Sequence, residues 1–450
     1  MTNQTSDTNP DHTETGQEKI GPVLLQKGIS RHNAMALFYS GAMTIIFVTF
    51  LNLVNPYLLE EHLSLPDDIR GNFTGNLYVM AEIVSLSLTI PLGVLSDRVG
   101  RRIIFGTGFV IVSIALLLLP TATTPMEMVV WRLLVSAGIA CCTTMTASLI
   151  ADYADNSSRG KILAFNGIFS ALGIVIVASL ILSSLPDRFQ SLGYDPITAG
   201  KFTYWIAAAL AVIAGCVAFK GIRNIEKPHE DESLPLAETF KTGMKEIIGN
   251  PRLSLGAGAT YVSRGDLTVL AAFFSLWIVA VGTGGGMDTG EAQAKAGMLF
   301  GISQLAVPLF LPVVGWLVDK LDRVTALAWA MGLAAIGYTW LGLVEDPINS
   351  PVIYFAGIIT GMGEAAVIVT APALVGQETP RKIRGSVIGT IAFFGAIGVL
   401  VNVKVAGLAY DNISYTAPFL IMGGLNALMA TWAILVRWRC GHKAITKGEH

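Results

Sequence analysis

The stretch Gly93-Val-Leu-Ser-Asp97-Arg98-Val-Gly100-Arg101-Arg102 lies where one long apolar segment of this chain ends and the next begins. A short basic run in that place is typical of a tight turn on the cytoplasmic side of a membrane. A weaker copy, Gly315-Trp-Leu-Val-Asp319-Lys320-Leu-Asp322-Arg323, begins 222 residues later. Two copies at about half the chain length predict a membrane protein with two duplicated halves.

The composition also indicates a membrane protein. Of the 450 residues 52% are hydrophobic and only 14% are charged, and the mean hydropathy is +0.59. A soluble protein usually carries about 25% charged residues. Many apolar runs exceed the roughly 20 residues that a helix needs to cross a bilayer. The four cysteines have no metal-ligand spacing, so we expect no metal site, and we expect no cofactor.

The apolar runs predict an all-α membrane protein with twelve transmembrane helices. Backbone groups inside lipid must be hydrogen-bonded within their own segment, and a helix achieves this. Proline interrupts several runs, which membrane helices tolerate. The predicted spans are 33–58, 72–96, 102–120, 126–151, 160–184, 202–220, 254–282, 294–318, 324–344, 351–376, 384–410 and 414–437.

The distribution of Lys and Arg predicts the orientation. With twelve spans and an internal amino terminus, one set of connections carries 23 of the 30 Lys and Arg residues. The opposite set carries four and the spans carry three. Basic residues concentrate on the cytoplasmic side. We therefore expect a multi-pass protein of the plasma (inner) membrane with both termini in the cytoplasm.

The same reading divides the chain into five parts. A polar tail, 1–32, precedes a six-helix bundle at 33–220, and a second bundle at 254–437 precedes a short cytoplasmic tail at 438–450. The first 28 residues have no apolar core, so they predict a disordered cytoplasmic tail and no signal peptide. Leu236, Phe240, Met244 and Ile248 recur every four residues in the linker 221–253. This predicts an amphipathic helix on the inner membrane surface, and a plain flexible linker is the alternative.

A second match supports the duplication. The segment from Asp152 to Gly173 contains Arg-Gly-Lys just before span five, and the segment from Gln377 to Gly398 contains Arg-Gly-Ser just before span eleven. Its offset of 225 residues is close to the first offset of 222. Parallel six-helix repeats are one plan of secondary transporters, with the substrate site between the halves near mid-membrane.

The signature at 93–102 resembles the motif between spans two and three of the major facilitator superfamily. The resemblance covers residues 30 to 438 and implies two six-helix repeats. It also implies a cytoplasmic gate in which Asp97 pairs with an arginine of the other half, and a topology signal is the plainer alternative. The predicted gate residues are Gly93, Asp97, Arg98, Gly100, Arg101, Arg102, Asp319 and Arg323. The Gly-Pro motif of drug antiporters in span five is missing, since 167–173 contains glycines and no proline.

Six ionisable residues lie well inside the predicted spans, away from the span ends. A charge at the centre of a membrane helix costs about 2.5–3.5 kcal/mol, so each is expected to face protein or a water-filled cavity. For proton coupling we predict Glu364, Asp266 and Glu82. For substrate binding or charge pairing we predict Arg132, Arg264 and Lys404. Buried ion pairs that only orient helices are the alternative, and Lys404 could instead extend to the outer surface.

These observations predict a secondary active transporter that works by alternating access and is coupled to protons. Three basic residues in the spans slightly favour an organic anion as the substrate. A proton-driven exporter of lipophilic compounds and a transporter-like sensor are the alternatives. The sequence contains no His-Glu-x-x-His, Gly-x-Ser-x-Gly or Gly-x-x-x-x-Gly-Lys motif, so no enzyme is expected. We expect a small molecule, protons and the lipid bilayer as partners, no nucleic acid, and a monomer.

Overall fold

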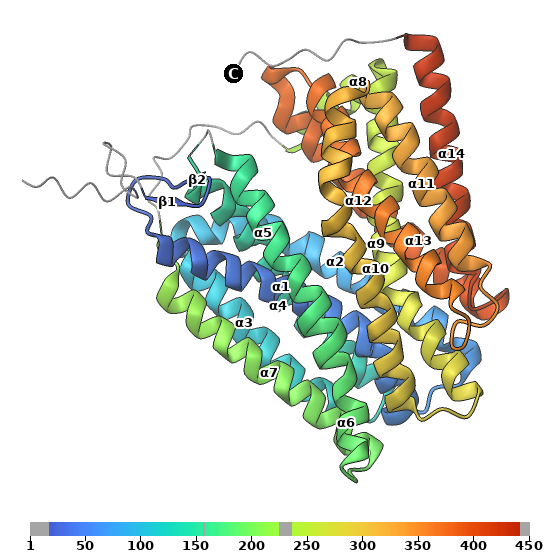
Figure 1. The fold of residues 1–450 in the computed structure, drawn as a ribbon. Helices are drawn as coiled ribbons and strands as arrows, with labels where there is room; N and C mark the ends of the chain where they lie inside the picture. Colours follow the sequence, from blue (N-terminus) through green and yellow to red (C-terminus); the bar gives the residue numbers. More distant parts are fainter. Residues whose placement is uncertain (1–17, 156–157, 225–235, 442–450) are drawn as a thin grey trace, which may run out of the picture.

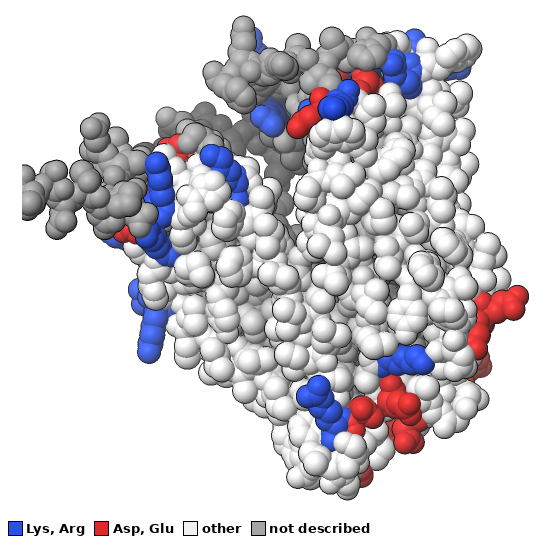
Figure 2. Space-filling model, viewed as in Figure 1, with Lys and Arg blue, Asp and Glu red and all other residues white. Residues whose placement is uncertain are grey.

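The structure, a computed structural model, describes residues 18–155, 158–224 and 236–441. Within that part of the chain, twelve helical segments are long and apolar enough to cross a membrane, which confirms the predicted number. They form two bundles that lie close together at one end and diverge toward the other (Figure 1). The middle of the visible surface carries almost no charged side chains, as expected of a lipid-facing band (Figure 2).

The first bundle contains spans one to six. Several of its helices begin at a capping side chain or a proline. Asp195, for example, accepts a hydrogen bond of 3.0 Å from the N–H of Thr198 at the start of the sixth span. The helices are α1 (Arg31–Tyr57), α2 (Asp67–Val99), α3 (Arg101–Leu118), α4 (Pro125–Tyr153), α5 (Arg159–Gly173), the short α6 (Leu185–Ser191) and α7 (Pro196–Gly221).

The second bundle contains spans seven to twelve and follows a linker helix. Its members are α9 (Pro251–Gly284), α10 (Thr289–Lys320), α11 (Arg323–Gly342), α12 (Val352–Glu378), α13 (Arg384–Asn412) and α14 (Ala417–Cys440), and the linker helix is α8 (Leu236–Gly249). The end of the molecule at which α8 lies is called here the α8 end (Figure 1). The opposite end, which contains α6, is called the α6 end.

Span five departs from α-helical geometry in its middle. After Gly173 the backbone continues as a π-helix, Ile174–Ile181, and a 3-10 turn, Leu182–Ser184, before α6. Such irregular turns often mark hinges or functional sites. They occur in the span where drug antiporters are expected to have Gly-Pro, so the helix geometry of that span changes here without the Gly-Pro motif.

The amino-terminal prediction is wrong for the part that the structure describes. Residues Lys19–Ile20 (β1) and Val23–Leu24 (β2) pair as a two-stranded antiparallel hairpin. Val23 and Leu25 are fully buried, and the backbone N–H of Leu24 donates to Ser158 Oγ at 3.0 Å. The hairpin is thus attached to the α4–α5 connection. The predicted disorder of residues 1–17 lies outside the described residues.

The predicted linker helix is present as α8, but it packs against protein. Ile247 lies in a small core with Leu253 and Val387, and the Phe240 and Phe393 rings meet edge to face at 5.4 Å. A Cβ at Gly243 would come within 2.5 Å of the Ser386 carbonyl, so this contact with α13 requires glycine. The apolar face is therefore turned slightly from the predicted stripe, and Ile248 is exposed.

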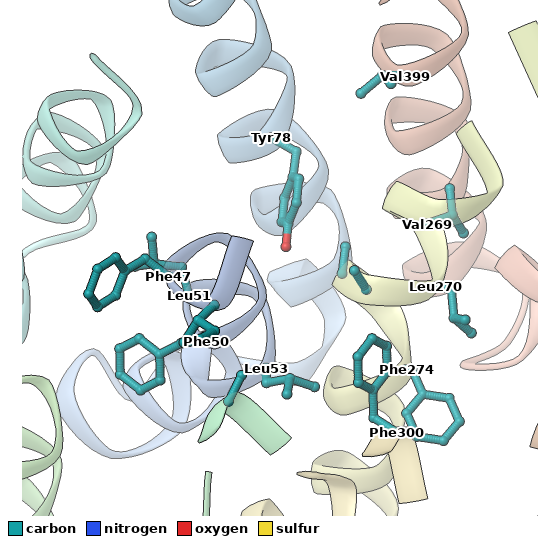
Figure 3. Close-up of a cluster of buried hydrophobic side chains, with 14 of the residues drawn as sticks. Phe47, Phe50, Leu51, Leu53, Tyr78, Val269, Leu270, Phe274, Phe300 and Val399 are labelled. Atoms are coloured by element: carbon teal, nitrogen blue, oxygen red, sulfur yellow. The ribbon is translucent and has the colours of Figure 1, made fainter. Parts of the chain in front are cut away.

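The two bundles are sealed together at the α6 end. One crossing joins α2 to α13, where a Cβ at Gly407 would lie 2.5 Å from the Gly71 carbonyl and 3.3 Å from the Gly75 Cα. A second joins α10 to span five, where Gly297 and Gly301 face serines of the irregular segment. Small residues let helix backbones approach this closely. Figure 3 shows the apolar residues behind these crossings, with Tyr78 and members of α1, α9, α10 and α13 in one cluster.

At the α8 end the bundles separate. On α2 the residues toward this end are exposed, with Ile90 at 56% and Val94 at 53%, whereas Gly71 to Tyr78 at the other end are mostly buried. The space-filling view shows a hollow between the two bundles at this end (Figure 2). The two bundles are therefore in contact at the α6 end and apart at the α8 end.

Candidate functional site

Asp266 of α9 and Glu364 of α12 line one small cavity inside the second bundle. Both side chains are almost completely buried, with 3% and 5% of their surface exposed. The cavity has a volume of about 10 Å³, and its other walls are mainly apolar side chains from α9, α11 and α12. The structure thus brings together two of the three residues predicted for proton coupling.

The hydrogen-bond partners of the two carboxylates are neutral. Asn426 of α14 donates to Asp266 Oδ2 at 2.8 Å, and Asp266 Oδ1 has no hydrogen-bond partner. Tyr338 Oη donates to Glu364 Oε1 at 2.9 Å, and Gln304 Nε2 donates to Oε2 at 3.1 Å. Neither carboxylate forms an ion pair with any described residue. The alternative of a buried ion pair that orients helices is therefore wrong for both residues.

Charged groups are expensive to bury without a charged partner. Neutral donors reduce this cost only in part, so protonation of one carboxyl group is a direct way to remove a buried charge. Asp266 and Glu364 also act on one another electrostatically. Two acids in one cavity can consequently hold a proton more readily than either would alone.

Glu82 lies apart from this cavity, in the first bundle. It is half-buried on α2, and the charged residue that acts on it electrostatically is Arg264 of α9, across the space between the halves. Arg264 is exposed, and its aliphatic carbons pack on Gly395 of α13, where a Cβ would lie 2.5 Å away. The acid on which Arg264 acts is thus Glu82, and no described arginine forms an ion pair with Asp266 or Glu364.

Arg132 of α4 is buried in the first bundle without a carboxylate partner among the described residues. Its Nη2 donates to Asn52 Oδ1 at 3.1 Å, and its guanidinium lies 5.5 Å from the centre of the Tyr78 ring. Its Nε and Nη1 atoms are buried and make no hydrogen bond. The first bundle therefore buries a cation among neutral groups, whereas the second buries two anions.

Lys404 of α13 joins the two halves. Its Nζ donates to Asn72 Oδ1 and to Asn76 Oδ1 of α2, each at 2.6 Å. Two turns toward the α6 end, Asp411 accepts from the N–H groups of Gly71 and Asn72 at 2.7 and 2.6 Å. Lys404 therefore does not extend to the outer surface. It belongs to the contacts that close the α6 end.

The signature at 93–102 forms the turn between α2 and α3. Gly100 has a φ of +101°, which a side chain would strain, and a Cβ there would also meet the Asn224 side chain at 2.5 Å. Arg101 pairs with buried Asp152 at the end of α4 and lies 3.6 Å from Asp97. All these contacts stay within the first bundle.

The expected gate contact is not formed in this conformation. Three residues of the signature are exposed at the open α8 end, namely Asp97, Arg98 and Arg102. Asp97 pairs with Arg101, an arginine of its own half. The N–H of Arg102 donates to Asn224 Oδ1 at 2.9 Å, so Asn224 rather than Asp97 bonds the backbone at the start of α3. A gate formed by Asp97 across the halves stays a prediction for a closed α8 end.

In the copy at 315–323 the residue that makes the most contacts is Asp322. Asp319 is exposed, and Arg323 bonds the Val318 carbonyl. Asp322, which replaces the glycine, caps α11 by accepting from the N–H groups of Val324 and Thr325. It also lies 3.5 Å from Arg252.

Arg252 connects three helix ends of the second bundle. Besides Asp322 it pairs with Glu378 at 3.4 Å, and Arg437 lies 3.8 Å from Asp322. Asp152 and Glu378 stand near the ends of spans four and ten, so each bundle binds one such acid with an arginine. This network was not predicted, because Asp322 and Glu378 lie near span ends, where a charged residue is ordinary and gives no signal of a partner.

The polar neighbours of the acid pair were also missed. Gln304, Tyr338 and Asn426 are not among the predicted site residues. They lie on three different helices, and no local spacing connects them to Asp266 or Glu364. A polar residue in the middle of an apolar span was the one available signal.

The family model of the Major Facilitator Superfamily matches residues 36–290 and 286–447. The chain belongs to the major facilitator superfamily. This confirms the predicted twelve-helix fold and its two repeats, and it indicates a transporter rather than an enzyme.

The relatives of this chain include magnetosome proteins and a transporter named for its substrate. The chain is 25% identical to the magnetosome protein MamH of Paramagnetospirillum magneticum, over 90% of this chain and 92% of that protein. It is 27% identical to MamZ of the same organism over 85% of this chain, which spans only 59% of MamZ. A gentisate transporter of Corynebacterium glutamicum is 24% identical over 77% of this chain and 75% of its own length.

Solved structures show the same fold. The nucleoside transporter NupG superimposes with a TM-score of 0.71, at 14% identity, over 90% of this chain and 98% of that chain. At this identity the likeness shows the fold alone. The relatives of this superfamily member therefore differ too much in their named substrates to indicate a single substrate class.

Proposed function

We propose that this protein is a proton-coupled secondary transporter that moves a small organic anion by alternating access. The observation that carries the coupling is the cavity shared by Asp266 and Glu364, two buried carboxylates with neutral partners. A proton bound there removes buried negative charge. If the closed and open conformations hydrate the cavity differently, proton binding and conformation become linked.

The substrate proposal rests on Arg264. Its exposed guanidinium lies on the same helix as Asp266, two residues away, at a depth where the bundles diverge. An arginine matches a carboxylate with paired N–H donors, and Glu82 across the space would be displaced from it by an anionic solute. The similarity to a gentisate transporter, a protein named for an organic anion, supports the same class.

We further propose that the α8 end faces the cytoplasm. The connections at that end carry most Lys and Arg residues of the chain, and cytoplasmic loops are enriched in them. The structure then represents a conformation open to the cytoplasm, in the plasma membrane. A monomer suffices for this scheme, because both halves of the transport path lie in one chain.

An exporter of lipophilic compounds is the second candidate. It is favoured by one observation, a 25% identity over 191 residues with the multidrug efflux pump PmrA of Streptococcus pneumoniae, which covers 42% of this chain. The missing Gly-Pro motif disfavours it. The choice between the two candidates depends on whether the solute carries a negative or a positive charge.

The test uses purified protein in proteoliposomes with an imposed pH gradient. Labelled gentisate, uridine and ethidium serve as an organic anion, a neutral solute and a lipophilic cation. We expect gentisate uptake to follow the gradient and to be lost with Arg264→Gln. Asp266→Asn and Glu364→Gln should still exchange gentisate when the pH is equal on both sides of the membrane. An imposed pH gradient should no longer drive gentisate uptake in either variant.

Glu291→Gln is the matched control, since it removes an exposed carboxylate from the first turn of α10. A normal gradient response in both cavity variants would refute coupling at this site. Gradient-driven movement of ethidium alone would support the exporter instead.

A further inference from the structure

We propose that a polar pocket across the closed α6 end binds a small organic diamine, whose two ammonium groups join the two halves of the protein. The residues that line this pocket stand at helix ends, and they come from both halves. None of them belongs to the Asp266–Glu364 cavity. The inference goes beyond the proposed function, because it assigns a second site and a second class of ligand.

The size of the pocket favours a small organic molecule. Its volume is about 310 Å³. A water molecule takes about 30 Å³ of the liquid, and ligand sites in proteins begin at about 300 Å³. A bare metal ion, held by oxygen atoms at about 2.0–2.6 Å, would leave most of this volume to water.

The first half supplies a polar wall that is fixed from behind. Glu61 lies in a π-helical turn, Leu58–His62, at the end of span one, and Gln190 lies on α6. Gln190 Nε2 donates to Tyr57 Oη at 2.9 Å, and Tyr57 Oη donates to the Pro196 carbonyl at 2.7 Å. Because Tyr57 is fully buried, these bonds hold Gln190 and Pro196 in place at the pocket.

The second half supplies a glycine-rich turn between α9 and α10. Gly286 has a φ of +87°, and the N–H of Met287 donates to the Gly282 carbonyl at 3.0 Å, so the chain reverses within a few residues. Thr283 before the turn and Asp288 after it consequently line the same pocket.

Two groups in this wall have no partner in the described part of the chain. Thr289 is only 8% exposed and lines the pocket, yet its hydroxyl makes no hydrogen bond there. Asp288 precedes α10, but its carboxylate accepts no capping hydrogen bond from the first turn. Buried polar groups in proteins normally have a partner. The two groups therefore indicate a ligand that carries hydrogen-bond donors.

The charges of the pocket favour a cation with two ammonium groups. Glu61 and Asp288 stand on opposite halves, and neither forms an ion pair with a described residue. Among the described residues no Lys or Arg lines the pocket, and Lys201 and Lys295 act electrostatically on exposed acids outside it. An ammonium group forms strong hydrogen bonds to a carboxylate, so each acid can take one end of a diamine. An anionic solute would be repelled.

A ligand that joins both walls would hold the α6 end closed. A Cβ at Gly290 of α10 would clash with the Gln190 side chain and lie 2.9 Å from the Asp187 Cα, so the two halves touch beside the pocket. The complete pocket exists only while this contact is made. A ligand that binds both walls therefore favours the closed conformation. With the α8 end in the cytoplasm, as proposed, the amine reaches the pocket from outside.

The experiment measures binding of putrescine, a four-carbon diamine, to the detergent-purified full chain by isothermal titration calorimetry. We expect saturable binding of putrescine. n-Butylamine has the same number of carbons and one ammonium group, so it should bind about tenfold more weakly, as the loss of one charged hydrogen bond implies. No binding of putrescine, or equal affinity for the two amines, would overturn the proposal.

Glu61→Gln and Asp288→Asn test the two halves separately. Each should weaken putrescine binding about tenfold, and asparagine still suits the residue before a helix, so α10 should begin as before. Thr289→Val should weaken binding severalfold. Glu291→Gln is the matched control, since Glu291 is an exposed acid of the first turn of α10 that does not line the pocket, and it should bind putrescine normally.

Undiminished binding in either Glu61→Gln or Asp288→Asn would contradict a ligand that joins the two halves. An equal loss of affinity in Glu291→Gln would contradict a site in this pocket. Because the titration measures binding and not transport, a failure here leaves the proposed function standing, and a failure of proton coupling leaves this site standing.

Discussion

Gly407→Ala should open the closed α6 end. The new Cβ would lie 2.5 Å from the Gly71 carbonyl, and ordinary contact begins at 3.4 Å, so α2 and α13 must separate by about 0.9 Å. Because the obstacle is backbone, no side chain can turn away. The shift would stretch the bonds from Asp411 to the N–H groups of Gly71 and Asn72, which are now 2.7 and 2.6 Å long.

The size of the effect follows from these two bonds. A hydrogen bond to a charged group contributes about 1.5–3 kcal/mol, and the half-exposed position of Asp411 argues for the lower end. Losing most of both would destabilise the closed α6 end by about 2–3 kcal/mol. Since 1.4 kcal/mol corresponds to a factor of ten, the ratio of closed to open molecules should fall roughly 30- to 100-fold.

The assay is a spin-label distance across the α6 end. Leu192 and Ile413 are exposed there on the two halves, at 73% and 74%, and accept labels after replacement by cysteine. The exposed Cys216 and Cys440 are first changed to serine. Gly407→Ala should add a longer-distance population that the parent lacks.

Gly389→Ala is the matched control, because a Cβ at that position on the same helix meets nothing within 4 Å. It should leave the distance distribution unchanged. An unchanged distribution in folded Gly407→Ala, or the same new population in Gly389→Ala, would refute the reasoning that this glycine contact closes the α6 end.

Three further changes test other contacts. Lys404→Met removes two hydrogen bonds of 2.6 Å to α2, so it should also populate the longer spin-label distance. Lys201→Met should not, because Lys201 of α7 makes no hydrogen bond to the second bundle among the described residues. Asp322→Asn breaks a buried ion pair and should destabilise the protein by about 3 kcal/mol or more in chemical unfolding, with exposed Asp319→Asn close to neutral. Val23→Asp places a charge in a fully buried position, so hydrogen exchange of the hairpin backbone should rise while the spans stay protected.

The fold was predictable because each span carries its own signal. Length and hydropathy identify a membrane helix without knowledge of its neighbours, and the repeated basic turns at 93–102 and 315–323 mark the duplication. The hairpin at 19–24 was not predictable in this way. Its apolar residues are few and lie in polar surroundings, and the residues that bury them come from the α4–α5 connection more than a hundred positions away.

The candidate site was predictable in its parts and not in its arrangement. Asp266 and Glu364 stood out because a charge in a membrane helix is costly. That they share one cavity depends on how α9 packs against α12, and no spacing along the chain reports this. The electrostatic effect of Arg264 on Glu82 of the other half, and the neutral surroundings of Arg132, likewise depend on packing between distant helices.

The central claim is that Asp266 and Glu364 carry the coupling proton. The most direct measurement records proton movement and solute uptake together, with a pH-sensitive dye enclosed in proteoliposomes and the labelled solute that the substrate panel identifies. The unmodified protein should move protons with each uptake of solute, and the double variant Asp266→Asn, Glu364→Gln should exchange solute without proton movement. Undiminished proton movement in the double variant would contradict the account.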